Sequence, residues 1–278
     1  MSDFYQPIGV FDSGYGGLTI FKELLIQLPQ YDYIYLGDNA RNPYGTRSFE
    51  VVYDYTRQAV FQLFDQGCRL VVVACNTASA KALRNIQQLD LPKSFPDRRV
   101  LGVIRPSVEM IPEMTKTGHV GILGTNGTVI SESYPMEIAK ISPDSPIIVV
   151  QEACPMWVPI VENNLIESPG AALFIKENIE ELFRRDPLID TIILGCTHYP
   201  LLMKVIRQFL PEGVHLLTQG PIVADRLKDY LSRHPEMELN CSKSGRRDYF
   251  TTESAATFDQ LANLFLGSEV KSKHIKLG

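Results

Sequence analysis

The sequence predicts an α/β protein with two pseudo-symmetric domains, each a mainly parallel sheet flanked by helices, and an active site in the interdomain cleft. Three observations lead to this prediction. Short apolar runs alternate with amphipathic segments along the chain. The runs are almost continuously apolar, which is typical of parallel strands covered on both faces. Segments of the first half also recur in related form in the second half.

The apolar runs give the expected strands, and the segments between them give the expected helices. Strands are predicted at residues 8–12, 33–37, 70–75, 99–104, 119–124, 147–151, 190–196 and 214–218. Helices are predicted at residues 18–28, 48–66 and 171–184. Ser48 is a good N-cap for the second helix, Gly67 suits its C-terminal end, and Pro29 stops the first.

Two pairs of segments indicate the internal duplication. "IGVFDSGYGG" at 8–17 resembles "VGILGTNGT" at 120–128, and "VVVACNTAS" at 71–79 resembles "IILGCTHYP" at 192–200. We therefore expect a discontinuous first domain, residues 1–97 and 211–278, and a second domain, residues 98–210. The strand and helix after residue 211 are expected to complete the first domain. From residue 268 the sequence suggests a loosely held terminus.

Composition excludes several classes of protein. The 278 residues are 45% apolar and 21% charged, as in a globular protein with a full core. The net charge of −5, without a basic stripe, predicts no nucleic-acid partner. The apolar runs are too short to cross a membrane. The first residues lack the pattern of a secretory signal, so we expect a cytoplasmic protein.

The five cysteines predict free thiols, because an odd number without a secretory signal argues against a disulfide framework. No pair has metal-ligand spacing, so we expect no metal site. Cys68 and Cys241 are expected to be small buried groups. Cys154 lies close to the predicted site and is expected to be structural.

Polar residues gather where the predicted strands end, which is where open α/β sheets bind ligands. Asp12, Cys75, Thr125, Glu152 and Cys196 lie at or just past such ends. Helix starts follow, and their free N–H groups bind anions such as carboxylates. Hydroxyl and amide groups at the same turns add hydrogen-bonding capacity: Ser13, Asn76, Thr77 and Thr197.

Two turns rich in glycine or other turn residues carry weaker signals. "GYGG" at 14–17 lacks the spacing of a nucleotide-binding loop. "DNARNPYG" at 38–45 is expected to be either a surface loop or a lid whose Tyr44 and Gly45 donate hydrogen bonds to a ligand.

Two cysteines on opposite walls of a cleft suit racemisation, because one base cannot reach both faces of a carbon. A thiol with a pKa near ~8.5 is a competent base near neutral pH. One cysteine must begin as thiolate and the other as thiol. Asp12 is expected near Cys75, and His198 lies two residues beyond Cys196. Asp12, Glu152 and His198 could each hold a proton from a thiol or orient a substrate ammonium group.

With these residues in view, the chain resembles the glutamate racemases of the cofactor-independent aspartate/glutamate racemase superfamily. The matching motifs run nearly from end to end: "IGVFDSGYGGL", "DNARNPYGTRS", "ACNTAS", "VGILGT" and "GCTHYPLL". One departure is "GVIRPSVE" at 102–109, where Arg105 and Ser107 replace an expected acidic residue and glycine.

The resemblance implies interconversion of L- and D-glutamate without any cofactor or metal, supplying D-glutamate for peptidoglycan. It implies that Cys75 handles the proton of the D-enantiomer and Cys196 that of the L-enantiomer. It also implies an enzyme that is often a homodimer and whose small-molecule substrate is glutamate. The supporting groups that match are Asp12, Glu152 and His198. The substrate contacts that match are Asp12, Ser13, Tyr44, Gly45, Asn76, Thr77, Thr197 and His198, with Thr125 as an addition.

Three alternative functions remain open from the residues. The chain could be a sister racemase acting on aspartate or hydantoins. It could be a cysteine hydrolase or amidotransferase with Cys196 as nucleophile and His198 as base, which leaves Cys75 unexplained. It could also be an amino-acid-binding protein without catalysis.

Overall fold

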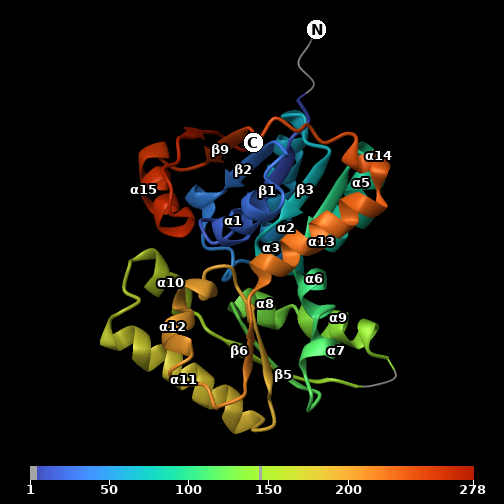
Figure 1. The fold of residues 1–278 in the computed structure, drawn as a ribbon. Coiled ribbons are helices and arrows are strands. Elements are labelled where there is room, and N and C mark those ends of the chain that lie inside the picture. The colour runs from blue at the N-terminus through green and yellow to red at the C-terminus, as the bar shows by residue number, and fades with distance from the viewer. Residues whose placement is uncertain (1–4, 144–145) are drawn as a thin grey trace.

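Two parallel sheets organise the chain, one in each half of the molecule (Figure 1). The structure is a computed structural model that describes residues 5–143 and 146–278. The first sheet has the order β10-β9-β2-β1-β3-β4 and the second the order β6-β5-β7-β8, with every pair parallel. The strands of the first sheet are β1 (Ile8–Asp12), β2 (Tyr33–Gly37), β3 (Leu70–Val73), β4 (Arg99–Gly102), β9 (Arg247–Thr251) and β10 (Ser272–His274). Those of the second are β5 (His119–Gly124), β6 (Ile148–Ala153), β7 (Thr191–Gly195) and β8 (His215–Leu217).

Helices connect the strands in both halves. Those before β5 are α1 (Leu18–Gln27), η1 (Asn39–Arg41), α2 (Phe49–Asp65), α3 (Asn76–Lys81), α4 (Leu83–Asn85), η2 (Ile86–Asp90), α5 (Leu91–Ser94), α6 (Ile104–Val108) and α7 (Ile111–Met114). Those after it are α8 (Asn126–Ile130), α9 (Ser133–Ile141), α10 (Trp157–Glu162), α11 (Pro169–Arg185), η3 (Tyr199–Leu202), α12 (Met203–Ile206), α13 (Gln219–Arg233), α14 (Pro235–Glu238) and α15 (Ala255–Leu266). Among the described residues, none of these helices has the length and hydrophobicity needed to span a bilayer.

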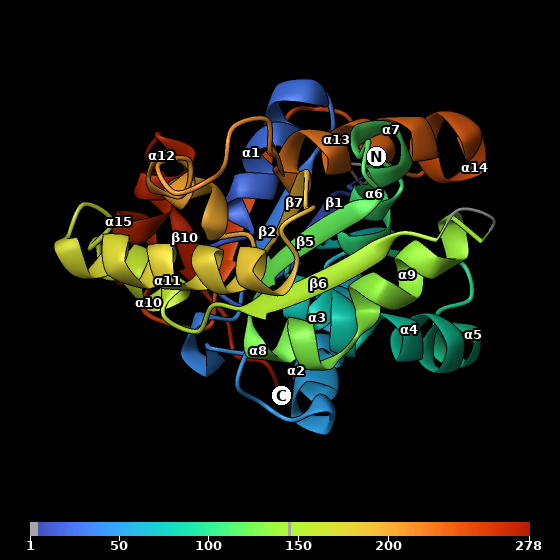
Figure 2. The same cartoon turned by 90° about the horizontal axis from the view of Figure 1, so that it is seen from below.

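Helices cover both faces of each sheet, which explains the continuous apolar runs. In the second half, α11 lies on one side of the sheet and α9 on the other (Figure 2). Ile192 and Leu194 of β7 belong to the core cluster that contains the buried residues of α11. Ile193, between them, packs with Tyr134 and Ile138 of α9. Successive side chains of a strand point to opposite faces, so both faces must be apolar.

The chain passes between the halves at different points from those expected. β4 pairs with β3 in the first sheet, so residues 99–102 do not begin the second domain. β8 pairs with β7, so the strand after residue 211 completes the second sheet and not the first. Apolar runs identify strands but not their partners, which explains both errors. β10 pairs with β9, so part of the segment expected to be a loose terminus is held in the first sheet.

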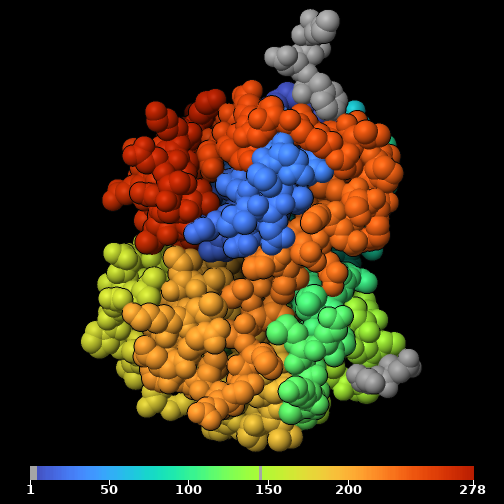
Figure 3. All heavy atoms as spheres, viewed as in Figure 1, coloured from blue at the N-terminus to red at the C-terminus, as the bar shows by residue number. Residues whose placement is uncertain are grey.

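The return to the first half begins with α13, which packs against α1 on the front of the molecule (Figures 1 and 3). A Cβ on Gly220, near the start of α13, would lie 3.1 Å from the carbonyl oxygen of Thr19. Glycine therefore permits this close helix approach.

Strand register brings the predicted site residues to one edge of each sheet. Phe11 of β1 pairs with Val73 of β3, so Asp12 and the turn of Cys75 lie at the same edge. Gly124 of β5 pairs with Gly195 of β7, so Thr125 and Cys196 also lie together. The duplicated segments therefore occupy equivalent places in the two sheets.

The C-terminal segment is fastened to the first half by buried Asp32. Its Oδ1 accepts hydrogen bonds from the main-chain N–H of Ser244 (2.8 Å), the hydroxyl of Ser244 (2.7 Å) and the N–H of Arg246 (2.8 Å). Burial acts to raise the pKa of Asp32, but hydrogen bonds from Ser242, Arg246 and Ser244 outweigh it and lower that pKa.

We predict that Asp32→Ala lowers the free energy of unfolding by about 2–3 kcal/mol at pH 7, because it strands buried donors. The carboxylate has a lowered pKa when folded, so its contribution is present above the unfolded pKa near ~3.9 and is lost as pH falls. Urea unfolding at pH 7 and pH 3 measures this, and the difference between the proteins should shrink at pH 3. Asp65→Ala, on the exposed end of α2, is the control. Equal stability of Asp32→Ala and the unsubstituted protein at pH 7 would contradict the prediction.

Candidate active site

Cys75 is the N-cap of α3, directly after the end of β3. Its Sγ accepts a hydrogen bond from the N–H of Ala78 at 3.4 Å and lies 3.2 Å from Oγ of Ser13. Asp12 ends β1 beside it, and its Oδ2 accepts from the N–H of Gly14 at 2.9 Å. Oδ1 of Asp12 is buried without a partner among the described residues. The first half therefore supplies a thiol, a hydroxyl and a carboxyl group with spare hydrogen-bonding capacity.

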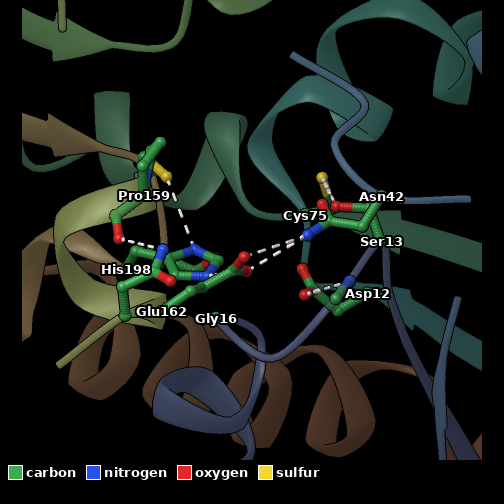
Figure 4. A network of polar contacts seen from close by, with 12 residues as sticks. Asp12, Ser13, Gly16, Asn42, Cys75, Pro159, Glu162 and His198 are labelled. Atoms are coloured by element: carbon green, nitrogen blue, oxygen red, sulfur yellow. Dashed lines mark hydrogen bonds and ion pairs between the residues drawn. The ribbon is translucent and has the colours of Figure 1, made fainter. Parts of the chain in front are cut away.

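Cys196 follows β7 in the equivalent place and has a different set of partners (Figure 4). Its Sγ lies 3.9 Å from Nδ1 of His198, whose Nε2 lies 2.9 Å from Oε1 of Glu162. Glu162, at the end of α10, in turn accepts a hydrogen bond from Nδ2 of Asn42 at 3.1 Å. Because Asn42 belongs to the loop after β2, this chain of contacts joins the two halves.

The surroundings of the two cysteines shift the pKa values of His198, Cys75 and Asp12. Burial acts to lower the pKa of His198, but hydrogen bonds to Cys196 and Glu162, and their negative charges, raise it from 6.5 to about 10. The imidazole is therefore positively charged at neutral pH and lies 3.9 Å from the sulfur of Cys196. Burial, followed by the charge of Asp12, raises the pKa of Cys75 to about 12, so this sulfur keeps its proton. Burial also raises the pKa of Asp12.

The charges of the two sulfurs act on each other, because the charge of Cys196 is among the causes that raise the pKa of Cys75. Each cysteine is only 6% exposed, so the two thiols are shielded from bulk water. A pair of buried cysteines can accept a proton at a sulfur that is ionised and donate one from a sulfur that is protonated.

The seam, where the turn after β1 packs against Thr197 and His198, needs a glycine at position 16. A Cβ on Gly16 would lie 2.3 Å from Oγ1 of Thr197 and 2.4 Å from Nδ1 of His198. Any larger residue would push the first half away from the turn of Cys196. The hydroxyl of Thr19 also donates to the carbonyl oxygen of Thr197 at 3.0 Å, across the same seam.

A second contact between the halves lies on the side of Cys75. The hydroxyls of Thr77 and Thr125 are 3.0 Å apart, and the N–H of Gly127 donates to the carbonyl oxygen of Gly45 at 2.8 Å. Ser13, Asn76, Thr77, Thr125, Thr197 and His198 are thus held in turns beside the two cysteines. Tyr44 is buried with its hydroxyl bonded to Asp38, so of the expected lid donors only main-chain groups remain for a ligand.

The side chain of Glu152, one of the predicted supporting groups, points toward α11. Its carboxylate is held by Arg185 and accepts from Nδ2 of Asn178 at 2.8 Å, so it is engaged with α11 and does not contact His198. Glu152 ends β6 as expected, but strand-end position does not fix where a side chain points. The carboxylate that lies within hydrogen-bond distance of Nε2 of His198 is that of Glu162.

The site residues predicted from the sequence do not include Glu162, Asn42 and Asp38, although the structure places them in these contacts. Glu162 lies at the end of a short helix and carries no periodic or strand-end signal, so pattern reasoning had no means of finding it. Asn42 and Asp38 lie in the loop 38–45, which was recognised as a candidate lid without these roles. The composition of that loop, rich in amide and carboxylate side chains, was the available signal.

Neither cysteine lines the cavity of about 670 Å³ found elsewhere, between α3, α6, α9 and α13. Its walls carry the cationic residues Lys81, Arg84, Arg105, Lys140, Arg226 and Arg233, with Glu109 and Glu137. The cysteine site is therefore identified by its chemistry and not by the size of a hollow. Among residues 5–143 and 146–278, no three metal-ligating side chains are grouped as a metal site.

Comparison with known proteins agrees with this geometry. A sequence model of the Asp/Glu/Hydantoin racemase family matches residues 20–227. The glutamate racemase of Geobacter metallireducens is 40% identical over 96% of this chain and 94% of its own length.

Solved structures extend the similarity to the fold. Glutamate racemase isoform RacE1 from Bacillus anthracis superposes with a TM-score of 0.87 at 35% identity, covering 98% of both chains. Glutamate racemase from Francisella tularensis, in complex with D-glutamate, gives 0.86 at 32% identity and covers 99% of this chain and 98% of its own. The chain belongs to the Asp/Glu/Hydantoin racemase family, in the same branch as the glutamate racemases.

Proposed function

We propose that this protein interconverts L- and D-glutamate by two-base proton transfer at Cα, with Cys75 and Cys196 as the acid/base pair. The observation that carries the proposal is the pair of buried thiols at equivalent strand ends of the two sheets, each with its own proton-handling partner. The substrate is inferred from the relatives, which are glutamate racemases over nearly the whole chain. Supply of D-glutamate for peptidoglycan is the biological role that this family membership suggests.

The proton inventory of the site sets the direction of each step. With L-glutamate bound, the thiolate of Cys196 removes the Cα proton and becomes a thiol. The thiol of Cys75 then donates its proton to the opposite face of Cα and becomes a thiolate. D-glutamate reverses the sequence, starting from a thiolate on Cys75. No atom other than the exchanged hydrogen changes place, so the reaction is balanced without a co-reactant.

The neighbouring groups are proposed to adjust each thiol. His198, held by Glu162, stabilises the thiolate of Cys196 as an imidazolium. Asp12 is proposed to act on Cys75: in its charged form it raises the pKa of the thiol, and in its neutral form it removes that opposition to ionisation. The Cα carbanion spreads its charge into the substrate carboxylate, which needs hydrogen-bond donors in a site closed to water. Ser13, Thr77, Thr125 and Thr197 supply hydroxyls, and the turns of Asn76 and Gly45 supply main-chain groups.

One arrangement in the site also fits a second candidate function. The order Cys196, His198, Glu162 is that of a nucleophile, a base and an orienting carboxylate, as in cysteine hydrolases. That mechanism would proceed through a covalent bond between Sγ of Cys196 and the substrate. It gives no role to Cys75, and the family relatives favour racemisation.

Two finer expectations remain proposals. We propose a cytoplasmic location, because all five cysteines are free and such thiols persist in reducing compartments. The resemblance to the family also suggests a homodimer. Light scattering on the eluted protein tests this, since a dimer should show twice the chain mass of 31.3 kDa. A mass equal to one chain at micromolar concentration would contradict the dimer.

Single replacement of Cys75 or Cys196 by alanine should lower racemisation of glutamate by roughly 10²–10⁴-fold, because each removes one of two required proton carriers. Circular dichroism of enantiomerically pure substrate in heavy water follows the reaction, and NMR should find deuterium at Cα of the inverted product. Cys241→Ala, in α14's C-terminal turn, is the matched control and should retain full turnover. Normal turnover in either test variant, or a covalent adduct on Cys196, would count against the two-base scheme.

Glu162→Gln should lower the pKa of His198, because it removes a negative partner that raises it to about 10. The imidazolium is present below this pKa and is lost above it, so the alkaline limb of kcat/KM should move to lower pH. Turnover near pH 8 should fall on the order of tenfold. The pH profile of Glu152→Gln serves as the matched control and should keep its alkaline limb. An unmoved limb in Glu162→Gln would reject this role for Glu162.

A further inference from the structure

A closed ring of hydrogen bonds lies buried between the two cysteine turns. Nδ2 of Asn76 donates to Oε1 of Gln219 at 2.6 Å, and Nε2 of Gln219 donates to the hydroxyl oxygen of Tyr134 at 3.0 Å. The hydroxyl of Tyr134 then donates to Oδ1 of Asn76 at 2.7 Å. The side chains of Asn76, Gln219 and Tyr134 come from α3, α13 and α9 and are 3%, 2% and 0% exposed.

The directions of the three bonds fix both amide orientations. Each residue in the ring donates once and accepts once, so turning the amide of Asn76 or Gln219 by 180° would oppose like groups. Nε2 of Gln219 also reaches Oγ of Ser107 at 2.8 Å and the carbonyl oxygen of Val103 at 3.1 Å. The hydroxyl of Ser107 donates to the same carbonyl at 2.7 Å, which leaves its oxygen free to accept from Gln219. The ring is therefore anchored at the passage between the halves.

The ring touches both cysteine turns. Asn76 is joined directly to Cys75 by a peptide bond, at the first residue of α3. A Cβ on Gly195 would lie 3.3 Å from Cε2 of Tyr134, so the Tyr134 ring packs against the residue that precedes Cys196. Movement of either side chain would therefore be transmitted to one of the two sulfur-bearing turns.

We propose that Gln219 is a positioning residue that, through its ring with Asn76 and Tyr134, fixes the placement of the two cysteine turns relative to each other. This inference rests on the proposed function, since racemisation needs both sulfurs aligned with one carbon. A misplacement of about 1 Å in a catalytic constellation can cost on the order of 10²-fold in rate. Gln219 itself donates nothing to the substrate and acts only through its neighbours. Ser107, a departure from the family motif, completes the hydrogen bonding of Gln219.

Two variants open the ring in different ways. Tyr134→Phe removes one hydroxyl and keeps the aromatic packing on Gly195, whereas Gln219→Met keeps the side-chain length and removes every hydrogen bond. Each should lower kcat for glutamate by about 10- to 100-fold. Tyr33→Phe is the matched control, because it removes a buried tyrosine hydroxyl that donates to the carbonyl oxygen of Leu28 outside the ring, and its kcat should stay within about threefold.

Alkylation of the cysteines by iodoacetamide, followed residue by residue by mass spectrometry, separates positioning from unfolding. Opening the ring should raise the reactivity of Cys75 and Cys196 and move the midpoint of Cys75 alkylation to lower pH, because its turn becomes less buried. Cys68 and Cys241, which are buried and make no hydrogen bond to the ring among the described residues, should stay protected. Should Gln219→Met fail to fold, Tyr134→Phe decides the question.

The proposal is overturned if kcat of Tyr134→Phe stays within about twofold of the unsubstituted protein. It is equally overturned if activity falls while all the cysteines become reactive together, which would mark a merely structural role. Failure of the unsubstituted protein to racemise glutamate would reject the proposed function. Comparison of cysteine alkylation between the ring variants and the unsubstituted protein would still decide whether the ring positions the two turns.

Discussion

The approach of the turn after β1 to the turn after β7 is the contact on which the site depends. Gly16 has no side chain, and Thr197 and His198 occupy the space where one would be. This contact lets the carboxyl ends of two separate sheets share one small volume. Parallel sheets usually bind ligands at such ends, so apposing two of them places two sets of strand-end residues around the same ligand. The duplicated architecture becomes a single site only because these turns meet.

Equivalent positions in the two halves carry different partners, and this asymmetry gives the site its chemistry. Cys75 lies beside the hydroxyl of Ser13 and the buried carboxyl group of Asp12, and burial together with the charge of Asp12 favours its thiol form. Cys196 has as its neighbour an imidazole that is supported by a carboxylate. A perfectly symmetric pair would hold equal proton affinities and would need an outside event to choose a starting state. Divergence of the neighbours after duplication supplies that choice within the chain.

Much of the fold could be predicted from the sequence, because buried parallel strands leave continuous apolar runs and helix starts leave caps such as Ser48. Both cysteines, Asp12 and His198 could be proposed from the sequence because they lie at or just past strand ends. Strand partners could not be predicted: nothing in the run at 214–218 says that it pairs with β7. Glu162 was not predicted from the sequence, because the orientation of α10, and not position along the chain, brings its carboxylate to His198. Long-range contacts such as that of Gln219 with Asn76 leave no local pattern.

The bond between Nε2 of Gln219 and the carbonyl oxygen of Val103 has a mechanical consequence. Val103 follows the last strand by which the chain leaves the first half, and Gln219 begins the helix by which it returns. The two chain segments that connect the halves are therefore held side by side. This arrangement opposes translation of one half relative to the other more than it opposes rotation about the connecting segments.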